Sequence, residues 1–478
     1  MNGFFTPMLA QNPHGARRWR PVLVPLVIAG LCLAVALELC CDLGSRAWTR
    51  WHNLWPGINA LAPADPAEID AQPADYATLA GIELPANAAF KLRVIGNPAA
   101  AWYPDCQRSY ARNPWDLAAF RGRLYVGLGD AGNQGPSANA GPVPVYAYDP
   151  IADRFRQETT LPEEQLDRFY RHDDQLWIPG DDPRQSWDWG NLYQRSASGD
   201  WRQLRTLPNT IHAHPLTWQQ DRLFAGVSVT KAVPKGVGTQ HFGSAVAVSA
   251  DGGEHWDLIR LGGWRIFDFL TVQGRLYATD IFPGPGIQRW LDREQRQDFH
   301  APVYEFDGSA AFQRRADLTA AQLFPDTPEA GIRAALIQGA LPWQDATLYL
   351  GLTSRAEDGA PIRGAYLVRD LTPGAIDVAR LPLPDNVLAM DVRVDDGALQ
   401  ILFAQPQDDQ RWQSTLWTSR DARTWRQVLS FSATAPARAF ESLDGDWYFG
   451  LGNLTPPAPG DCTQADTATG TLLALSPI

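Results

Sequence analysis

The sequence lacks the local motifs of several enzyme classes. No G-x-S-x-G nucleophile elbow, P-loop or C-x-x-C pair occurs in its 478 residues. Their absence argues against a serine nucleophile on an elbow and against nucleotide chemistry built on a P-loop. Basic residues are also in the minority, with 41 Lys+Arg against 53 Asp+Glu and a formal net charge of −12. Because binding to a phosphate backbone needs a basic surface, nucleic acid is not an expected partner.

Cysteine is scarce, and its placement divides the chain. Three of the five cysteines, Cys32, Cys40 and Cys41, lie in one apolar stretch near the N-terminus. Only Cys106 and Cys462 remain in the rest of the chain. In an oxidising compartment such a lone pair is expected to form a disulfide.

The apolar stretch at 21–41 predicts a membrane anchor. Its only charge is Glu38, it has the length of ~20 residues that a bilayer requires, and three arginines at 17, 18 and 20 precede it. A cleaved signal peptide is the alternative, but no A-x-A-like cleavage site follows. We therefore expect a cytoplasmic tail (1–20), a transmembrane signal anchor (21–41), a juxtamembrane segment and linker (42–88), and a body (89–478). The body would lie in the periplasm or outside the cell, held by a single pass through the inner membrane.

A repeated turn-and-strand phrase organises the body. The chain is rich in residues that suit short strands and turns, with 40 Gly, 38 Pro and 19 Trp. Each phrase pairs a polar turn with an apolar strand, and successive copies are roughly fifty residues apart, as in a propeller. The seven copies lie at 120–127, 172–180, 219–226, 272–280, 343–351, 395–403 and 443–452.

Each of the first six copies is followed by a second hairpin, and the seventh is split. The second hairpins lie at 145–162, 191–208, 245–263, 303–319, 365–382 and 416–432. Residues 470–478 resemble the missing third strand and residues 90–98 the missing fourth. The predicted fold is therefore all-β, a seven-bladed β-propeller closed by pairing of the N- and C-terminal strands. Cys106 and Cys462 would then meet at the seam as a disulfide.

Residues 249–256, SADGGEHW, match the Asp-box S-x-D-x-G-x-x-W. A degenerate copy occurs at 419–425, in which Arg423 replaces the glycine and the spacing is one residue shorter. The chain thus resembles the Asp-box (BNR-repeat) sialidase-like propellers, in which the box caps the turn between the third and fourth strands of a blade. Catalytic sialidases have six blades, an Arg-Ile-Pro motif, three arginines and a Tyr-Glu pair. Only Arg265-Ile266 matches part of that set, so the resemblance implies the architecture and not sialidase activity.

Alignment of the innermost strands predicts a polar ring at the mouth of the central channel. The equivalent positions place Asp116, Asp268 and Asp391 there as candidate acids or bases. Candidate binding residues on the same face are Arg168, Arg265, Asp280, Arg438, Trp187 and Trp189. Two histidines two residues apart, His212 and His214, form a candidate site for a divalent metal. The structural alternatives are that these charges pair with one another and that the histidines are simply hydrogen-bonded.

Two functions fit this pattern. The first is a binding or assembly module whose long-loop face recognises a glycan or a protein. The second is a glycoside hydrolase or polysaccharide lyase that uses carboxylates of the channel. An enzyme predicts a deep pocket with perturbed carboxyl groups, whereas a module predicts a flatter face with exposed aromatic side chains.

Overall fold

The computed structural model describes residues 57–478, except 64–67, 70–79, 87, 134, 231–241, 284–302, 326–331, 356–360, 383–386, 408–410 and 461. These residues belong to one compact unit, Pro56–Ile478. The predicted tail (1–20) and anchor (21–41) lie outside the described residues. Within the described part of the chain, no helix combines the length and the apolar character needed to cross a membrane.

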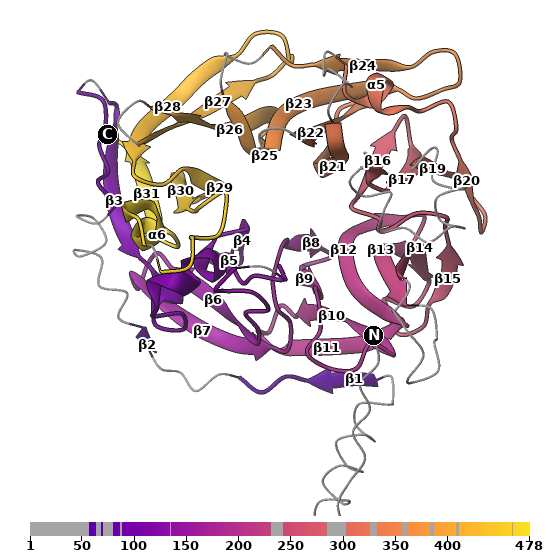
Figure 1. Ribbon diagram of the computed structural model, residues 1–478, viewed down its shortest axis with the longest axis horizontal. Coiled ribbons are helices and arrows are strands. Elements are labelled where there is room, and N and C mark those ends of the chain that lie inside the picture. The colour runs from indigo at the N-terminus through magenta and orange to yellow at the C-terminus, as the bar shows by residue number, and fades with distance from the viewer. Residues whose placement is uncertain are drawn as a thin grey trace, which may run out of the picture. The chain divides into compact units, whose positions relative to one another are not determined.

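Seven antiparallel sheets form a ring of blades (Figure 1). From the channel outward, blade 1 contains β4 (Asp116–Phe120), β5 (Arg123–Gly127), β6 (Val143–Asp149) and β7 (Arg154–Leu161). Blade 2 contains β8 (Tyr170–His172), β9 (Gln175–Pro179), β10 (Trp189–Arg195) and β11 (Trp201–Pro208). Blade 3 contains β12 (Thr210–Gln219), β13 (Arg222–Thr230), β14 (Phe242–Ser249) and β15 (Asp257–Arg260).

The next three blades repeat this order. Blade 4 contains β16 (Asp268–Val272), β17 (Arg275–Thr279), β19 (Val303–Phe306) and β20 (Phe312–Arg314). Blade 5 contains β21 (Ile332–Trp343), β22 (Ala346–Arg355), β23 (Pro361–Asp370) and β24 (Asp377–Arg380), with β18 (Phe282–Pro283) beside β21. Blade 6 contains β25 (Leu388–Asp395), β26 (Ala398–Pro406), β27 (Trp412–Ser419) and β28 (Arg426–Ala433). Two short helices, α5 (Ala320–Leu323) and α6 (Gln464–Ala468), lie in connecting segments.

The seventh blade joins the two ends of the predicted body (89–478), as the sequence predicts. It consists of β29 (Ala437–Leu443), β30 (Asp446–Leu451), β31 (Leu472–Pro477) and β3 (Phe90–Gly96), in that order. Strand β31 pairs with β3 in antiparallel register, with Leu475 opposite Leu92. All seven blades and the predicted closure are therefore confirmed.

The turn between the first and second strands explains why the repeat is visible in sequence. In six of the seven blades both central residues of this turn have positive φ, as in Gln273-Gly274 (51° and 75°) and Asp396-Gly397 (44° and 69°). Such turns match the twist of a β-hairpin and favour Gly, Asp and Asn. The apolar strand that follows is buried on both faces, because each blade packs against its two neighbours.

The Asp-box forms the capped turn between β14 and β15. The Oγ of Ser249 accepts the N–H of Gly253 at 2.8 Å, and the carboxylate of Asp251 accepts the N–H groups of Glu254 and His255. The indole of Trp256 donates to the carbonyl of Gly253. These bonds fix the turn and seat the indole between blades 2 and 3.

The degenerate copy keeps the same geometry with a different residue in place of the glycine. The indole N–H of Trp425 donates to the carbonyl of Ala422, and Ala422 has a φ of 56°. The sequence alignment assigned this position to Arg423, whose N–H instead donates to Asp421. The cap survives because the carboxylate of Asp421 also accepts the N–H of Thr424.

The segment before the propeller follows the outer rim of the ring. Strand β1 (Gly57–Ala60) pairs with β11 of blade 2, and β2 (Glu68–Ile69) pairs with β7 of blade 1. Residue Glu83 then bridges to Ser432 of blade 6. Described parts of the predicted linker (42–88) thus pair with the outer strands of three blades on either side of the seam, as Figure 1 shows for β1 and β2.

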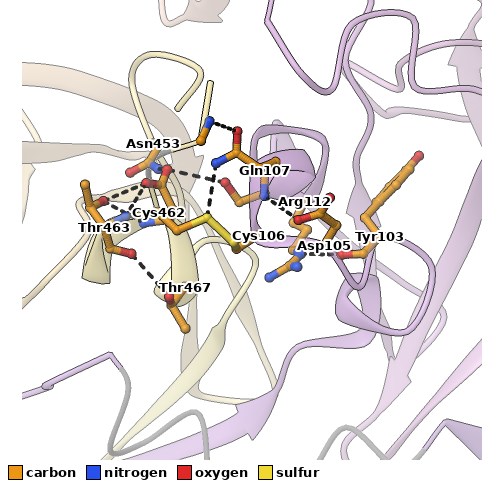
Figure 2. The surroundings of a disulfide bond; sticks show 12 residues. Tyr103, Asp105, Cys106, Gln107, Arg112, Asn453, Cys462, Thr463 and Thr467 are labelled. Atoms are coloured by element: carbon orange, nitrogen blue, oxygen red, sulfur yellow. Dashed lines mark hydrogen bonds between the residues drawn. A yellow bond between two sulfur atoms is a disulfide. The ribbon is translucent and has the colours of Figure 1, made fainter. Parts of the chain in front are cut away.

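The predicted disulfide joins Cys106 and Cys462 at the seam, with their Cα atoms 6.1 Å apart (Figure 2). Cys106 begins the 3₁₀ helix η2 (Cys106–Arg112), and Cys462 lies two residues before α6. The side chain of Gln107 binds the N–H of Gly460 and the Sγ of Cys462. These contacts connect the loop that follows β3 to the loop that precedes β31.

Candidate functional site

The innermost strands surround a polar cavity of about 410 Å³. Four of the predicted residues line it, namely Asp116, Arg168, Asp268 and Asp391. Aromatic residues also line this cavity. The aromatic lining residues are Trp115, Phe169, Tyr170, Trp218 and Phe269.

Each of the three aspartates is bonded to the main chain of the next blade. Asp116 of blade 1 accepts the N–H of Phe169 at 2.7 Å, and Asp268 of blade 4 accepts the N–H of Ala340 at 2.9 Å. Asp391 of blade 6 accepts the N–H of Phe440 at 3.0 Å. The repeated carboxylate therefore links neighbouring innermost strands around the ring.

Two arginines neutralise these carboxylates, and two of the three ion pairs join blades that are not adjacent. Arg168, before β8, contacts Asp268 with its Nη1 atom 3.1 Å from Oδ2. Arg393 of blade 6 forms ion pairs with Asp391, at 3.1 Å between Nη1 and Oδ1, and with Asp116 of blade 1. The structure thus agrees with the reading in which charges of the channel pair with one another.

Arg393 and Glu441 belong to the ring but were missed in the sequence. Each stands two residues after the aligned ring position of its strand, so its side chain returns to the same face. Glu441 accepts the N–H of Ala119 and lies 4.0 Å from the Nε of Arg393. An alignment that continued every second residue along the innermost strands would have included both.

Burial shapes the protonation of this ring. Burial raises the pKa of Asp391 to about 6, although the nearby Arg393 charge acts in the opposite direction. Burial alone would lower the pKa of Arg393, but the carboxylates of Asp391, Asp116 and Glu441 raise it overall. The guanidinium therefore stays charged at the centre of three carboxyl groups.

A second cluster lies at the long-loop mouth of the channel and contains His212 and His214. The Nδ1 of His212 lies 2.6 Å from the Oδ1 of Asp181, and the Nδ1 of His214 lies 3.8 Å from the Oδ2 of Asp167. One ligand-type atom from each of Asp181, His212 and His214 lies within 4.8 Å of those of the other two. The structure thus adds carboxylates to the two histidines that the sequence singled out.

Burial dominates the protonation of the mouth cluster. It raises the pKa of Asp181 to about 6 and that of Asp182 to about 7. Burial and the neighbouring Arg265 charge hold the pKa of His212 well below its usual range. Asp167 differs, because its neighbours His214 and Gln165 lower its pKa although burial alone would raise it. Neutral imidazole and crowded carboxyl groups therefore coexist at neutral pH.

Arg265 and Asp280 meet at the edge of this cluster. The main-chain N–H of Arg265 donates to the Oδ1 of Asp280 at 2.9 Å, and its Nε donates to Ser228. Burial raises the pKa of Asp280 to about 7. Gly263 packs so closely on this carboxyl that a Cβ there would lie 1.9 Å from Oδ2. Asp280 is therefore a fixed acceptor for the loop that carries Arg265.

The remaining predicted residues are held by packing. The guanidinium of Arg438 lies 4.0 Å from the centre of the Trp115 ring and donates to the carbonyl of Asn453. Trp187 and Trp189 are half-buried, and the indole of Trp187 donates to the carbonyl of Pro183. Neither tryptophan is an exposed stacking platform, and neither lines the cavity.

Glu163, a fully buried residue near the mouth, gives the channel entrance a testable pH dependence. It accepts hydrogen bonds from Asn191 and Tyr193, and burial raises its pKa to about 8. A raised pKa means that its contribution to stability is complete below the unfolded-state pKa of ~4.3 and is lost as pH rises through 8.

The variant E163Q cannot ionise at this position, so it does not share the loss of stability of the wild type at high pH. The unfolding free energy of E163Q minus that of the wild type is therefore expected to increase between pH 5 and pH 9. Urea unfolding at each pH measures the difference. The exposed Glu254→Gln variant serves as control and should follow the wild type at every pH. A difference between E163Q and the wild type that stays constant over this range would contradict the assignment.

Comparisons with known proteins find no family and only weak structural likenesses. The chain matches no family model and no curated protein sequence. Similar solved structures include the Pan2 WD40 domain of Neurospora crassa, with 9% identity, coverage of 78% of this chain and 93% of that one, and a TM-score of 0.42. An ancestral GH74 enzyme has 11% identity, coverage of 72% and 45%, and a TM-score of 0.41. An α-L-arabinofuranosidase of Clostridium thermocellum has 9% identity, coverage of 50% and 82%, and a TM-score of 0.28.

These likenesses are too weak to bear on function. The sheet topology itself makes this chain a seven-bladed β-propeller protein. One fold of this kind hosts many activities, so function has to be argued from the channel and its mouth.

Proposed function

We propose that this chain is a membrane-anchored propeller outside the cytoplasm that binds a saccharide through its central channel. The apolar stretch at 21–41 after three arginines supports the anchor and its orientation. The observation that carries the binding role is the lining of the 410 Å³ cavity, which includes both aromatic and charged residues. Sugars have both apolar faces and hydroxyl groups, so they match a wall that offers stacking surfaces and hydrogen-bonding groups together.

The fixed positions of the charges favour binding over catalysis. Asp116, Asp268 and Asp391 each accept an N–H from the next blade and pair with an arginine. Groups held in this way recognise a ligand without rearrangement, which lowers the cost of binding. A carboxyl group that acts as a catalytic acid or base has to exchange a proton with the substrate, and the fixed partners of these aspartates hinder such an exchange.

A glycoside hydrolase or lyase is the second candidate, because a cavity lined by a carboxyl group of perturbed pKa is the feature expected of an enzyme, and Asp391 supplies it. This residue lines the cavity, and burial raises its pKa to about 6. A carboxyl group that stays partly protonated near neutral pH is suited to act as a general acid on a glycosidic oxygen. Asp116, which shares Arg393 with Asp391, would then supply the second carboxylate.

A glycan array probed with the full chain in detergent tests the binding role. We expect at least one saccharide to bind and Trp115→Ala to weaken that binding about tenfold, because Trp115 forms part of the aromatic wall. Trp102→Ala is the matched control, since Trp102 is exposed and lies outside the cavity. Binding that is equally strong in both variants, or binding to proteins but to no saccharide, would contradict the proposal.

Release of reducing sugar from the bound saccharides separates the two candidates. Binding without turnover supports the module. Turnover that is lost in Asp391→Asn, with binding retained, would instead establish the hydrolase. Thermal unfolding of each variant shows whether the propeller is still folded.

A further inference from the structure

Three side chains of metal-ligand type converge at the long-loop mouth of the channel. Asp181 follows β9, while His212 and His214 lie two residues apart on β12. A main-chain bridge joins Asp181 to His212, and the two imidazole rings stack with their centres 5.5 Å apart. One ligand-type atom from each residue lies within 4.8 Å of those of the other two. Main-chain pairing and ring packing thus hold the three side chains in place.

The environment of the Nε2 atom of His214 is a second observation, independent of how the three side chains converge. This atom is buried without a hydrogen-bond partner, and only 8% of the residue is exposed. The other ring nitrogen, Nδ1, lies 3.8 Å from Asp167, which is too far for a hydrogen bond. A buried imidazole nitrogen without a partner is costly to maintain unless it binds something.

The charges around the imidazoles favour a cation. Asp167, Asp181 and Asp182 approach the two rings, and the Oδ2 of Asp182 lies 3.9 Å from the Nε2 of His212. Arg265 is one neighbouring positive group, and its Nε donates to Ser228. A divalent ion would neutralise the crowded carboxylates and take up the free nitrogen in one step.

We propose that Asp181, His212 and His214 bind one divalent transition-metal ion of the zinc class, with Asp167 as a neighbouring carboxylate. Two imidazoles and a carboxylate are a donor set that zinc accepts, with a further position left for water or a ligand. Calcium and magnesium prefer sites made only of oxygen atoms. The site goes beyond saccharide binding, because it can be occupied and tested without any saccharide.

Isothermal titration of the full chain in detergent, stripped with EDTA, tests this site with Zn²⁺ as the probe. We expect one Zn²⁺ per chain with a Kd of about 1 µM or below. His214→Ala is expected to weaken binding at least about 100-fold. His255→Ala is the matched control, because His255 also pairs with an aspartate, Asp251, but is exposed at the surface. This control should bind Zn²⁺ as the wild type does.

The more conservative variant Asp181→Asn retains the side-chain volume and guards against misfolding in His214→Ala. It should also lose Zn²⁺ affinity by at least about tenfold, while its far-UV circular dichroism stays that of the wild type. The proposal is overturned if the wild type binds no Zn²⁺, if either variant at the site binds it unchanged, or if Ca²⁺ binds more tightly than Zn²⁺. Each of these results is independent of the glycan array.

Discussion

Replacing Arg393 with alanine is expected to lower the free energy of unfolding by about 3 kcal/mol, since it leaves buried carboxylates without their counter-charge. Arg393 pairs with Asp391 on its own strand and with Asp116 of blade 1, and its Nε lies 4.0 Å from Glu441 of blade 7. The side chain therefore connects three consecutive innermost strands around the channel. Urea unfolding followed by tryptophan fluorescence measures the loss.

Arg420→Ala is the control for this experiment. Arg420 also pairs with an aspartate of the same blade, Asp396, but both side chains are exposed, at 71% and 89%. A surface pair of this kind contributes at most about 1 kcal/mol. If the ring charges act as a network, Arg393→Ala will cost less in an Asp391→Asn background than in the wild type. Equal losses in R393A and R420A would show that the channel charges do not hold the blades together.

The blades could be predicted because their signals are local. The turn between the first two strands requires two residues with positive φ. Such turns favour dipeptides that tolerate this conformation, as Asp-Gly does at 396–397 and Gln-Gly at 273–274. Closure of the ring could be predicted by counting hairpins. Seven first hairpins but only six second hairpins were found, so one blade lacked its third and fourth strands. The Asp-box could be read in the same way, since the carboxylate of Asp251 accepts main-chain N–H groups within four residues.

Partners across the channel could not be predicted. The pairing of Arg393 with Asp116 depends on the ring bringing together residues 277 positions apart. Asp181 escaped notice because it lies in the loop after β9, and its role becomes visible only when a main-chain bridge sets it beside His212. Strand alignment places residues of equivalent strands but says nothing about which loops fold over them.

The edge strands of the segment before the propeller could not be predicted from its composition. Residues 59–76 are rich in Ala, Pro and Asp and carry no alternating pattern, so they resemble a linker. Strands β1 and β2 nevertheless form because edge pairing uses main-chain groups and does not require apolar side chains. By covering outer edges of blades 1 and 2, the segment also removes sites where another chain could pair.

Removing the disulfide with Cys106→Ser and Cys462→Ser together is expected to lower the unfolding free energy by about 3 kcal/mol. The two cysteines are 356 residues apart, so the bond restricts most of the unfolded propeller. Chain entropy alone would give about 6 kcal/mol for so long a loop. We expect less, because the unfolded chain retains some structure. Urea unfolding of the double variant and the oxidised wild type measures the difference.

The same bond tests where the propeller resides. A disulfide that closes the seam will form in the periplasm or outside the cell and will stay reduced in the cytoplasm. The full chain, alkylated with a thiol reagent during cell lysis, should therefore be labelled at Cys106 and Cys462 only after reduction. The double serine variant shows the background from the three N-terminal cysteines. Labelling of both positions before reduction would contradict an extracytoplasmic propeller. Closure of the ring would then depend on the pairing of β31 with β3 and on the segment before the propeller, such as β1.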